Sequence, residues 1–192
     1  MERPLTKSSV ARRQLSTAIE LLFAGGDQVS AYSLAANAWE VIDAMCEKGG
    51  IDSTSNDARE YIPSDKDLKR DYVNSPYRNF FKHADRDPEA QLPPISTDHL
   101  EGLMFLAVED YIRLHNRAPV QFQVFQAWYL AKNPEKLNAA AYGELIPRLR
   151  AVFPRIHLSQ RPEQLKAGMR ALHEASLDPG ILEDVRTESA YD

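Results

Sequence analysis

The chain has 192 residues, of which 43% are hydrophobic and 27% charged, and its net charge is −5 at pH 7. This length is enough for one domain with a substantial core, and the composition is that of an ordinary soluble globular protein. The acidic balance argues against a general nucleic-acid coat protein, although it is compatible with a local basic patch. Cys46 is the only cysteine, which excludes an intrachain disulfide framework and suits a reducing compartment.

Targeting signals are not evident in the sequence. The first residues, Met1-Glu2-Arg3-Pro4, have no apolar run behind them, so we expect no signal peptide. No window approaches the roughly 18–20 apolar residues that a membrane span needs. We therefore expect a cytoplasmic protein with no membrane partner.

The first half of the chain shows helical periodicity. Residues 7–24 carry an apolar stripe that ends at Gly25-Gly26, and a second amphipathic helix, capped by Asp27 or Ser30, runs to Lys48. Because the link between them is so short, the two helices should form an antiparallel pair.

A polar stretch over residues 51–64 predicts a loop with one short turn near its end. Residues 65–73 can form a helix, which Pro76 interrupts. Proline fits the first turn of a helix, so a new helix should begin at Pro76 and run to about Arg86. The proline-rich connector 88–96 follows.

Asp98 and Glu101 have the spacing of a capping box, and they precede the most apolar helix of the chain, over 98–116. Three further helical segments are expected, over 119–131, 138–153 with a kink at Pro147, and 162–176. The last ten or so residues are rich in acidic side chains and should form a loose tail.

These segments predict an all-α fold, because no alternating run of β-branched residues suggests a strand. We expect a helical bundle of four or five core helices with additional C-terminal helices. Residues 1–118 would form the core and 119–192 an appended helical segment with an acidic tail. The two parts can also belong to a single domain.

The densest group of reactive side chains lies between Asn74 and Pro88 and contains Arg78, Asn79 and His83. If a helix begins at Pro76, Arg78 and Asn79 lie in its first turn, where free backbone N–H groups and the helix dipole favour a phosphate. Arg78 can add a bidentate grip on that phosphate, and His83 can transfer a proton near neutral pH.

The pattern Arg78-Asn79-x-x-x-His83, on a helix that follows an early antiparallel pair, resembles the HEPN superfamily over roughly residues 7–116. The resemblance implies a helical bundle that binds RNA or a nucleotide, or cuts RNA without metal or cofactor at a site shared by a homodimer. Arg78 would hold the scissile phosphate, His83 would be general acid or base, and Asn79 would orient one of them. The segment Asn79–Ala84 also resembles a group of uncharacterised bacterial proteins, which implies no activity.

Helix geometry leaves a second interpretation open. Arg78 and His83 are five residues apart and diverge by about 140° on a regular helix, so they meet only if Arg78 wraps around the first turn or a second subunit completes the site. Alternatively, Arg78 pairs with Asp71 or another carboxylate, Phe80 and Phe81 anchor the helix, and the protein is a non-catalytic interaction module.

Three other features have competing explanations. His83, Asp85 and Asp87 are possible metal ligands, but no second Glu-x-x-His element accompanies them, and we expect no metal. Residues 148–170 contain six cationic side chains and one carboxylate, for a net charge of +5. We favour solvent-exposed helix faces over a binding surface for this segment. An aromatic group on 119–131 should pack in the core or a dimer interface rather than stack on bases: Phe122, Phe125, Trp128 and Tyr129.

Overall fold

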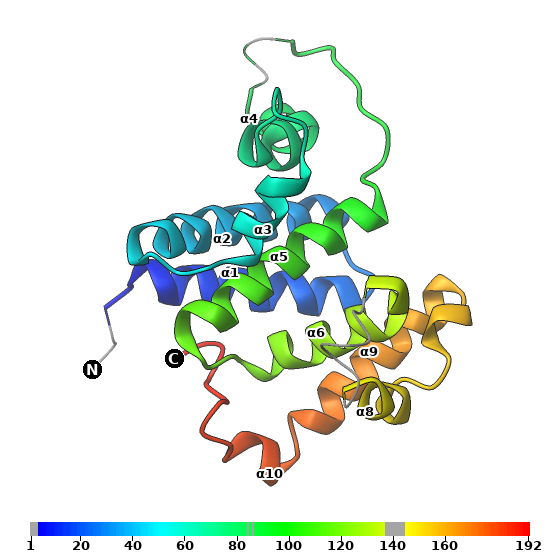
Figure 1. Cartoon of the computed structure of the whole chain (residues 1–192). Helices are drawn as coiled ribbons and strands as arrows, with labels where there is room; N and C mark the ends of the chain where they lie inside the picture. Colours follow the sequence, from blue (N-terminus) through cyan, green and yellow to red (C-terminus); the bar gives the residue numbers. More distant parts are fainter. Residues whose placement is uncertain (1–3, 84, 86, 137–144) are drawn as a thin grey trace.

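The computed structural model describes residues 4–83, 85, 87–136 and 145–192 and is built from helices (Figure 1). Over these ranges there is no strand, and one isolated bridge pairs Ala118 with Thr187. The all-α class predicted from the sequence is therefore confirmed. Of the helices in the described ranges, none combines the length and apolar character needed to cross a membrane.

The first two helices form the predicted antiparallel pair. α1 (Lys7–Phe23) and α2 (Gln28–Gly49) pack along each other. Gly25 between them has a φ of +65°, a left-handed conformation that glycine adopts without strain. Asp27 then caps α2 by accepting hydrogen bonds from the backbone N–H groups of Val29 and Ser30. The pair turns its large side chains inward, where these are buried: Leu15, Ile19, Tyr32, Trp39 and Ile42.

Three further long helices complete the core. α5 (Thr97–His115) lies against α2, while α6 (Val120–Lys132) and α9 (Arg161–Ala175) pack against α1 (Figure 1). The aromatic group of α6 is buried, as the core interpretation predicts. Phe23 meets Trp128 edge to face, with ring centroids 5.3 Å apart. A Cβ atom at Gly168 would lie 2.3 Å from the Phe23 ring, so only glycine allows α9 to approach this closely.

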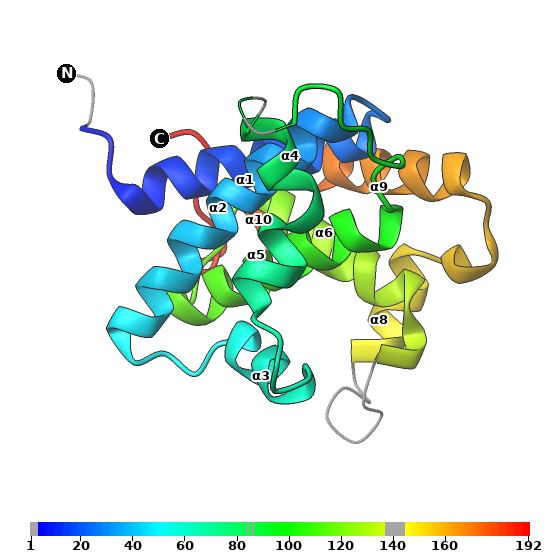
Figure 2. The same ribbon diagram turned by 90° about the horizontal axis from the view of Figure 1, so that it is seen from above.

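The remaining elements are short. They are α3 (Thr54–Tyr61), η1 (Leu68–Arg78), α4 (Asn79–Lys82), η2 (Pro134–Lys136), α8 (Leu145–Val152), η3 (Ile156–Leu158) and α10 (Pro179–Leu182). Seen from above, η1 and α4 cross over α2 and α5 (Figure 2). α8 contains Pro147, and residues 138–144 of the predicted helix lie outside the described residues.

The loop prediction is wrong for α3, which polar contacts hold in place. Ser53 caps this helix, and Ser55 is fully buried. The Ser55 hydroxyl donates a hydrogen bond to Asp110 at 2.5 Å and accepts one from the Trp39 indole N–H at 2.9 Å. Burial raises the pKa of the Asp110 carboxyl, although the hydrogen bonds from Ser55 oppose this. Hydrophobic periodicity cannot reveal a helix that is anchored through a buried carboxylate.

Glu101 has a different role from the predicted capping box. No side chain caps the start of α5, and Glu101 is fully buried. Its carboxylate forms ion pairs with Lys132 at the end of α6 and Arg161 at the start of α9. Both cations also lie over the Trp128 ring, at 5.4 and 5.7 Å from its centroid. One buried carboxylate thus joins three helices.

The expected loose tail is also wrong, because the last residues pack against α1 and α5 (Figure 1). Glu188 accepts a 2.7 Å hydrogen bond from the Tyr111 hydroxyl and pairs with Arg12 at 2.9 Å. The Tyr191 hydroxyl donates a hydrogen bond to Glu20 at 2.8 Å. Buried hydrophobic residues from both sides of residue 118 belong to one cluster.

We predict that Glu101→Gln lowers the free energy of unfolding by about 3 kcal/mol, because it leaves the largely buried Lys132 and the partly buried Arg161 without their counter-charge. Urea denaturation measures this loss. The control is Glu174→Gln, which alters an exposed pair with Arg170 at 3.9 Å and should change stability little. Equal stability of the Glu101 variant and wild type would show that the buried ion pairs do not hold the helices together.

Candidate functional site

Arg78 is the last residue of η1, three residues after the chain bends at Ser75, and α4 follows it directly. The backbone of Ser75 is extended, with φ −103° and ψ 138°, and the helical course resumes at Pro76. The predicted start at Pro76 is therefore correct. The predicted length is wrong, because α4 ends before His83, whose φ of −121° and ψ of 51° are not helical. Arg86, the expected end, lies outside the described residues.

Three side chains hold the guanidinium of Arg78. Its Nη1 donates a hydrogen bond to Asn74 Oδ1 at 2.9 Å and pairs with the Glu40 carboxylate. Its Nη2 donates to Asn37 Oδ1, also at 2.9 Å. Only 12% of the Arg78 side chain is exposed. These contacts fasten η1 to α2.

Glu40 is shared between two cations. Lys69 Nζ lies 2.5 Å from Oε1, while Arg78 pairs with Oε2. Burial acts to raise the pKa of Glu40, but the hydrogen bond from Lys69 and the charge of Arg78 outweigh it, so the pKa lies below its ordinary value. At neutral pH this cluster has two positive charges and one negative charge, and it is therefore electropositive.

The partner of Arg78 is the second of the two possibilities that the sequence left open. Asp71 pairs with its neighbour Arg70 at 2.7 Å. The carboxylate that pairs with Arg78 is instead that of Glu40. Asn37 is 41 residues from Arg78 in the chain, which no local motif can bridge. The only sequence signal is that Asn37 and Glu40, three residues apart, share one face of a helix.

Asn79 and His83 lie on the outside of the molecule. Asn79 is exposed, and 38% of the His83 side chain is exposed. His83 Nδ1 lies 3.8 Å from the Asp85 carboxylate. Over the described residues, no side-chain hydrogen bond joins Asn79 or His83 to Arg78. A single copy of the chain therefore does not assemble the three candidate residues into one site.

The two neighbouring phenylalanines behave differently. Phe81 packs near Tyr32 and Tyr77, with ring centroids 6.1 and 6.4 Å away. Phe80 is 38% exposed. The sequence predicts that both phenylalanines anchor the helix. In the structure α4 is anchored by Phe81.

A groove of about 460 Å³ runs between α1 and α2, with Arg78 in its lining. Lys7 and Gln14 line it from α1, and Asn37 and Glu40 from α2. Lys7 is exposed and forms no ion pair within the described part of the chain. Thr6 also lines the groove, and the apolar part of the lining consists of Leu5, Val10 and Val41. The groove combines cationic and amide donors with apolar surface, which suits an anionic ligand that has an apolar part.

The metal interpretation of His83, Asp85 and Asp87 has no support in the geometry. Within residues 4–83, 85, 87–136 and 145–192, no three His, Cys, Asp or Glu side chains lie close enough together to hold a metal ion. Cys46 is buried, and burial raises the pKa of its thiol to about 11. A thiol in this state is a poor nucleophile at neutral pH.

We predict that Glu40→Gln lowers the free energy of unfolding by about 1 kcal/mol at pH 7, because two ion pairs are lost. Since the pKa of Glu40 is lower in the folded chain than in the unfolded chain, its stabilisation exists above the unfolded-state pKa. It disappears as the pH falls through the folded-state pKa. Urea denaturation should therefore show a difference from wild type at pH 7 that shrinks towards zero below about pH 4.

Glu60→Gln is the matched control, because Glu60 is exposed and has no ion pair with any described residue. Its difference from wild type should be small at both pH values. A Glu40→Gln difference that is the same at pH 7 and pH 3 would contradict the assigned ion pairs.

Comparisons with known proteins give no family assignment. A scan against protein-family models, a search of curated proteins and a search of solved structures each found no match.

Proposed function

We propose that this chain is a HEPN-like domain that binds RNA or a nucleotide through phosphate at Arg78. The observation that carries the proposal is the groove between α1 and α2, where Lys7 and Arg78 line the same space as the amides of Gln14 and Asn37. Guanidinium and ammonium groups bind phosphate through charge-assisted hydrogen bonds. Lys69 supports this role, because it also forms an ion pair with Glu40. The single carboxylate therefore neutralises the charge of Arg78 only in part.

The proposed reaction is RNA cleavage without metal at a site shared by two copies of the chain. The RNA 2′-hydroxyl attacks the phosphorus held by Arg78 and loses its proton to a general base. The bond from phosphorus to the 5′-oxygen breaks, and that oxygen receives a proton from a general acid. His83 serves as acid or base, and Asn79 orients it. His83 does not line the groove that contains Arg78, so it would come from the second copy.

A non-catalytic interaction module is the second candidate, and one observation favours it. Both terminal nitrogens of Arg78 are already bonded within the chain, to Asn74, Glu40 and Asn37. In this role Arg78 holds η1 against α2, and His83 is the residue after α4 and takes no part in a reaction.

Cleavage of end-labelled RNA in the presence of EDTA distinguishes the two candidates. We predict that the wild-type protein cuts RNA and that His83→Ala lowers the rate by about 10²–10⁴-fold, as is usual when a general acid or base is lost. His173→Ala, at an exposed histidine on α9, should cut at the wild-type rate. Equal or absent cleavage by wild type and His83→Ala would refute the ribonuclease proposal.

Binding is measured separately on the same RNA by fluorescence anisotropy. Lys7→Met should weaken binding and reduce the salt dependence by the equivalent of about one phosphate contact, whereas Lys48→Met, at an exposed lysine that does not line the groove, should not. His83→Ala should bind as wild type does. A lower melting temperature with unchanged binding in Arg78→Met would support the interaction module.

A further inference from the structure

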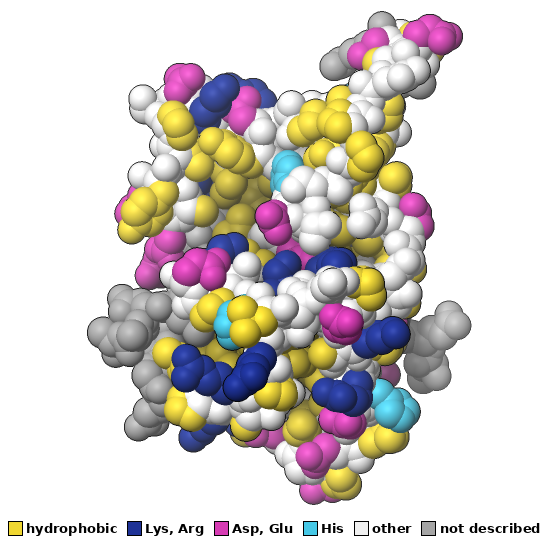
Figure 3. All heavy atoms as spheres, turned by 90° about the vertical axis from the view of Figure 1, so that its right-hand side faces the viewer, with side chains coloured by type: hydrophobic (Ala, Val, Ile, Leu, Met, Phe, Trp, Pro, Cys, Tyr) yellow, Lys and Arg dark blue, Asp and Glu magenta, His cyan; other side chains and the backbone are white. Residues whose placement is uncertain are grey.

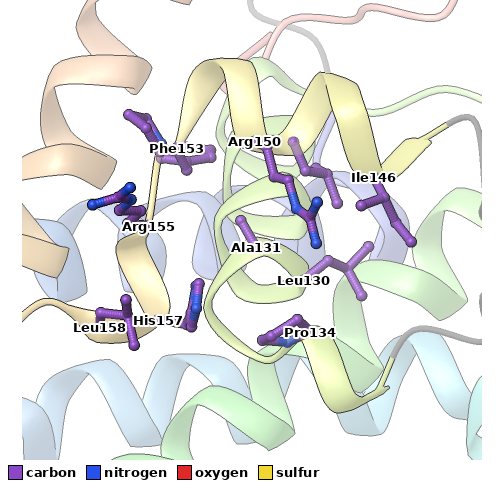
Figure 4. A pocket seen from close by; sticks show the side chains of 11 residues that line it. Leu130, Ala131, Pro134, Ile146, Arg150, Phe153, Arg155, His157 and Leu158 are labelled. Atoms are coloured by element: carbon purple, nitrogen blue, oxygen red, sulfur yellow. The ribbon is translucent and has the colours of Figure 1, made fainter.

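A second cavity lies in the C-terminal half of the chain, away from Arg78. It has a volume of about 550 Å³ and lies between the end of α6, α8 and η3 (Figure 4). This size is within the range of pockets that hold small molecules. Part of its lining, from Leu149 to Leu158, belongs to the basic segment 148–170, which was expected to form solvent-exposed helix faces.

The floor of this cavity is apolar. Leu130 and Ala131 contribute from α6, Leu149 from α8, and Phe153 from the residue after α8. Leu130, Leu149 and Phe153 are largely buried, with 8%, 4% and 3% exposure. Such a surface favours an alkyl or aryl group, because burial of that group removes apolar area from water on both sides.

The rim of the cavity is cationic. Arg150 extends from α8 over Leu130 and Ala131, His157 stands across the opening from it, and Arg155 lies at the edge (Figure 4). Lys and Arg side chains gather around exposed hydrophobic side chains on this face of the molecule (Figure 3). No Asp or Glu occurs in the described lining, and no ion pair to Arg150 or Arg155 is formed within the described ranges.

The backbone at the rim is unusual as well. Arg155 has a φ of +54° and a ψ of 25°, a left-handed conformation that favours glycine. Residues held in such conformations concentrate at ligand-binding sites. This conformation forms the turn between α8 and η3, and so it sets Arg150 and His157 on opposite sides of the same floor.

We propose that this cavity binds a small anionic amphiphile, namely a carboxylate with an alkyl or aryl body. The body packs on Leu130, Ala131 and Phe153. The carboxylate accepts hydrogen bonds from the Arg150 guanidinium, which can grip it in a bidentate manner. A nucleic acid is a poorer fit, because its sugar-phosphate backbone would leave the apolar floor without a partner.

Isothermal titration with decanoate, below the concentration at which it forms micelles, tests this site on the full chain. We expect saturable binding of one decanoate per chain and weaker binding of decanol. Arg150→Met keeps the length of the side chain but removes the charge, and it should weaken decanoate binding about tenfold while leaving decanol binding unchanged. Arg148→Met is the matched control, because Arg148 is exposed on α8 but does not line the cavity.

A second variant tests the floor. Ala131→Trp fills the cavity and should abolish the binding of both decanoate and decanol, with circular dichroism confirming that the variant is folded. Equal affinity of wild type and Arg150→Met for decanoate would overturn the proposal, as would undetectable binding to wild type. Decanoate binding that survives in folded Ala131→Trp would place the ligand elsewhere and would also overturn it.

Discussion

A buried carboxylate determines how the helices of this protein meet. Glu101 has no exposed surface, and its charge is tolerable only because Lys132 and Arg161 reach it from two other helices. The Trp128 ring beneath both cations continues into the aromatic core that α6 shares with α1. The end of α6 and the start of α9 are thereby held against the start of α5, and the cavity beneath α8 opens beside the end of α6.

Glu40 repeats this arrangement near the surface, with a different consequence. It also receives two cations, Lys69 and Arg78, but it is partly exposed and borders a groove. At Glu101 the ion pairs are enclosed, so they contribute to the structure alone. At Glu40 the ion pair with Arg78 borders an open groove, which a phosphate enters in the proposed function. The same contacts that pin η1 to α2 therefore also present Arg78 to a ligand in the proposed function.

Local patterns in the sequence predicted most of the long helices but not the contacts that position the candidate site. Helix-ending glycines, capping residues and apolar stripes predicted α1, α2, α5, α6 and α9, because each of these signals spans only a few residues. The helix α3, the role of Glu101 and the docked tail were missed, since each depends on a polar side chain that meets a partner far away in the chain. The same holds for Arg78 and Glu40.

The proposed function requires that Arg78 of one copy and His83 of another act on the same RNA. It is tested by mixing Arg78→Met and His83→Ala proteins, each inactive alone, under conditions that let subunits exchange. In a two-fold dimer, each mixed pair contains one site with both residues intact, so the mixture should recover about a quarter of the wild-type cleavage rate in EDTA. A mixture that stays as inactive as its components would contradict a shared site.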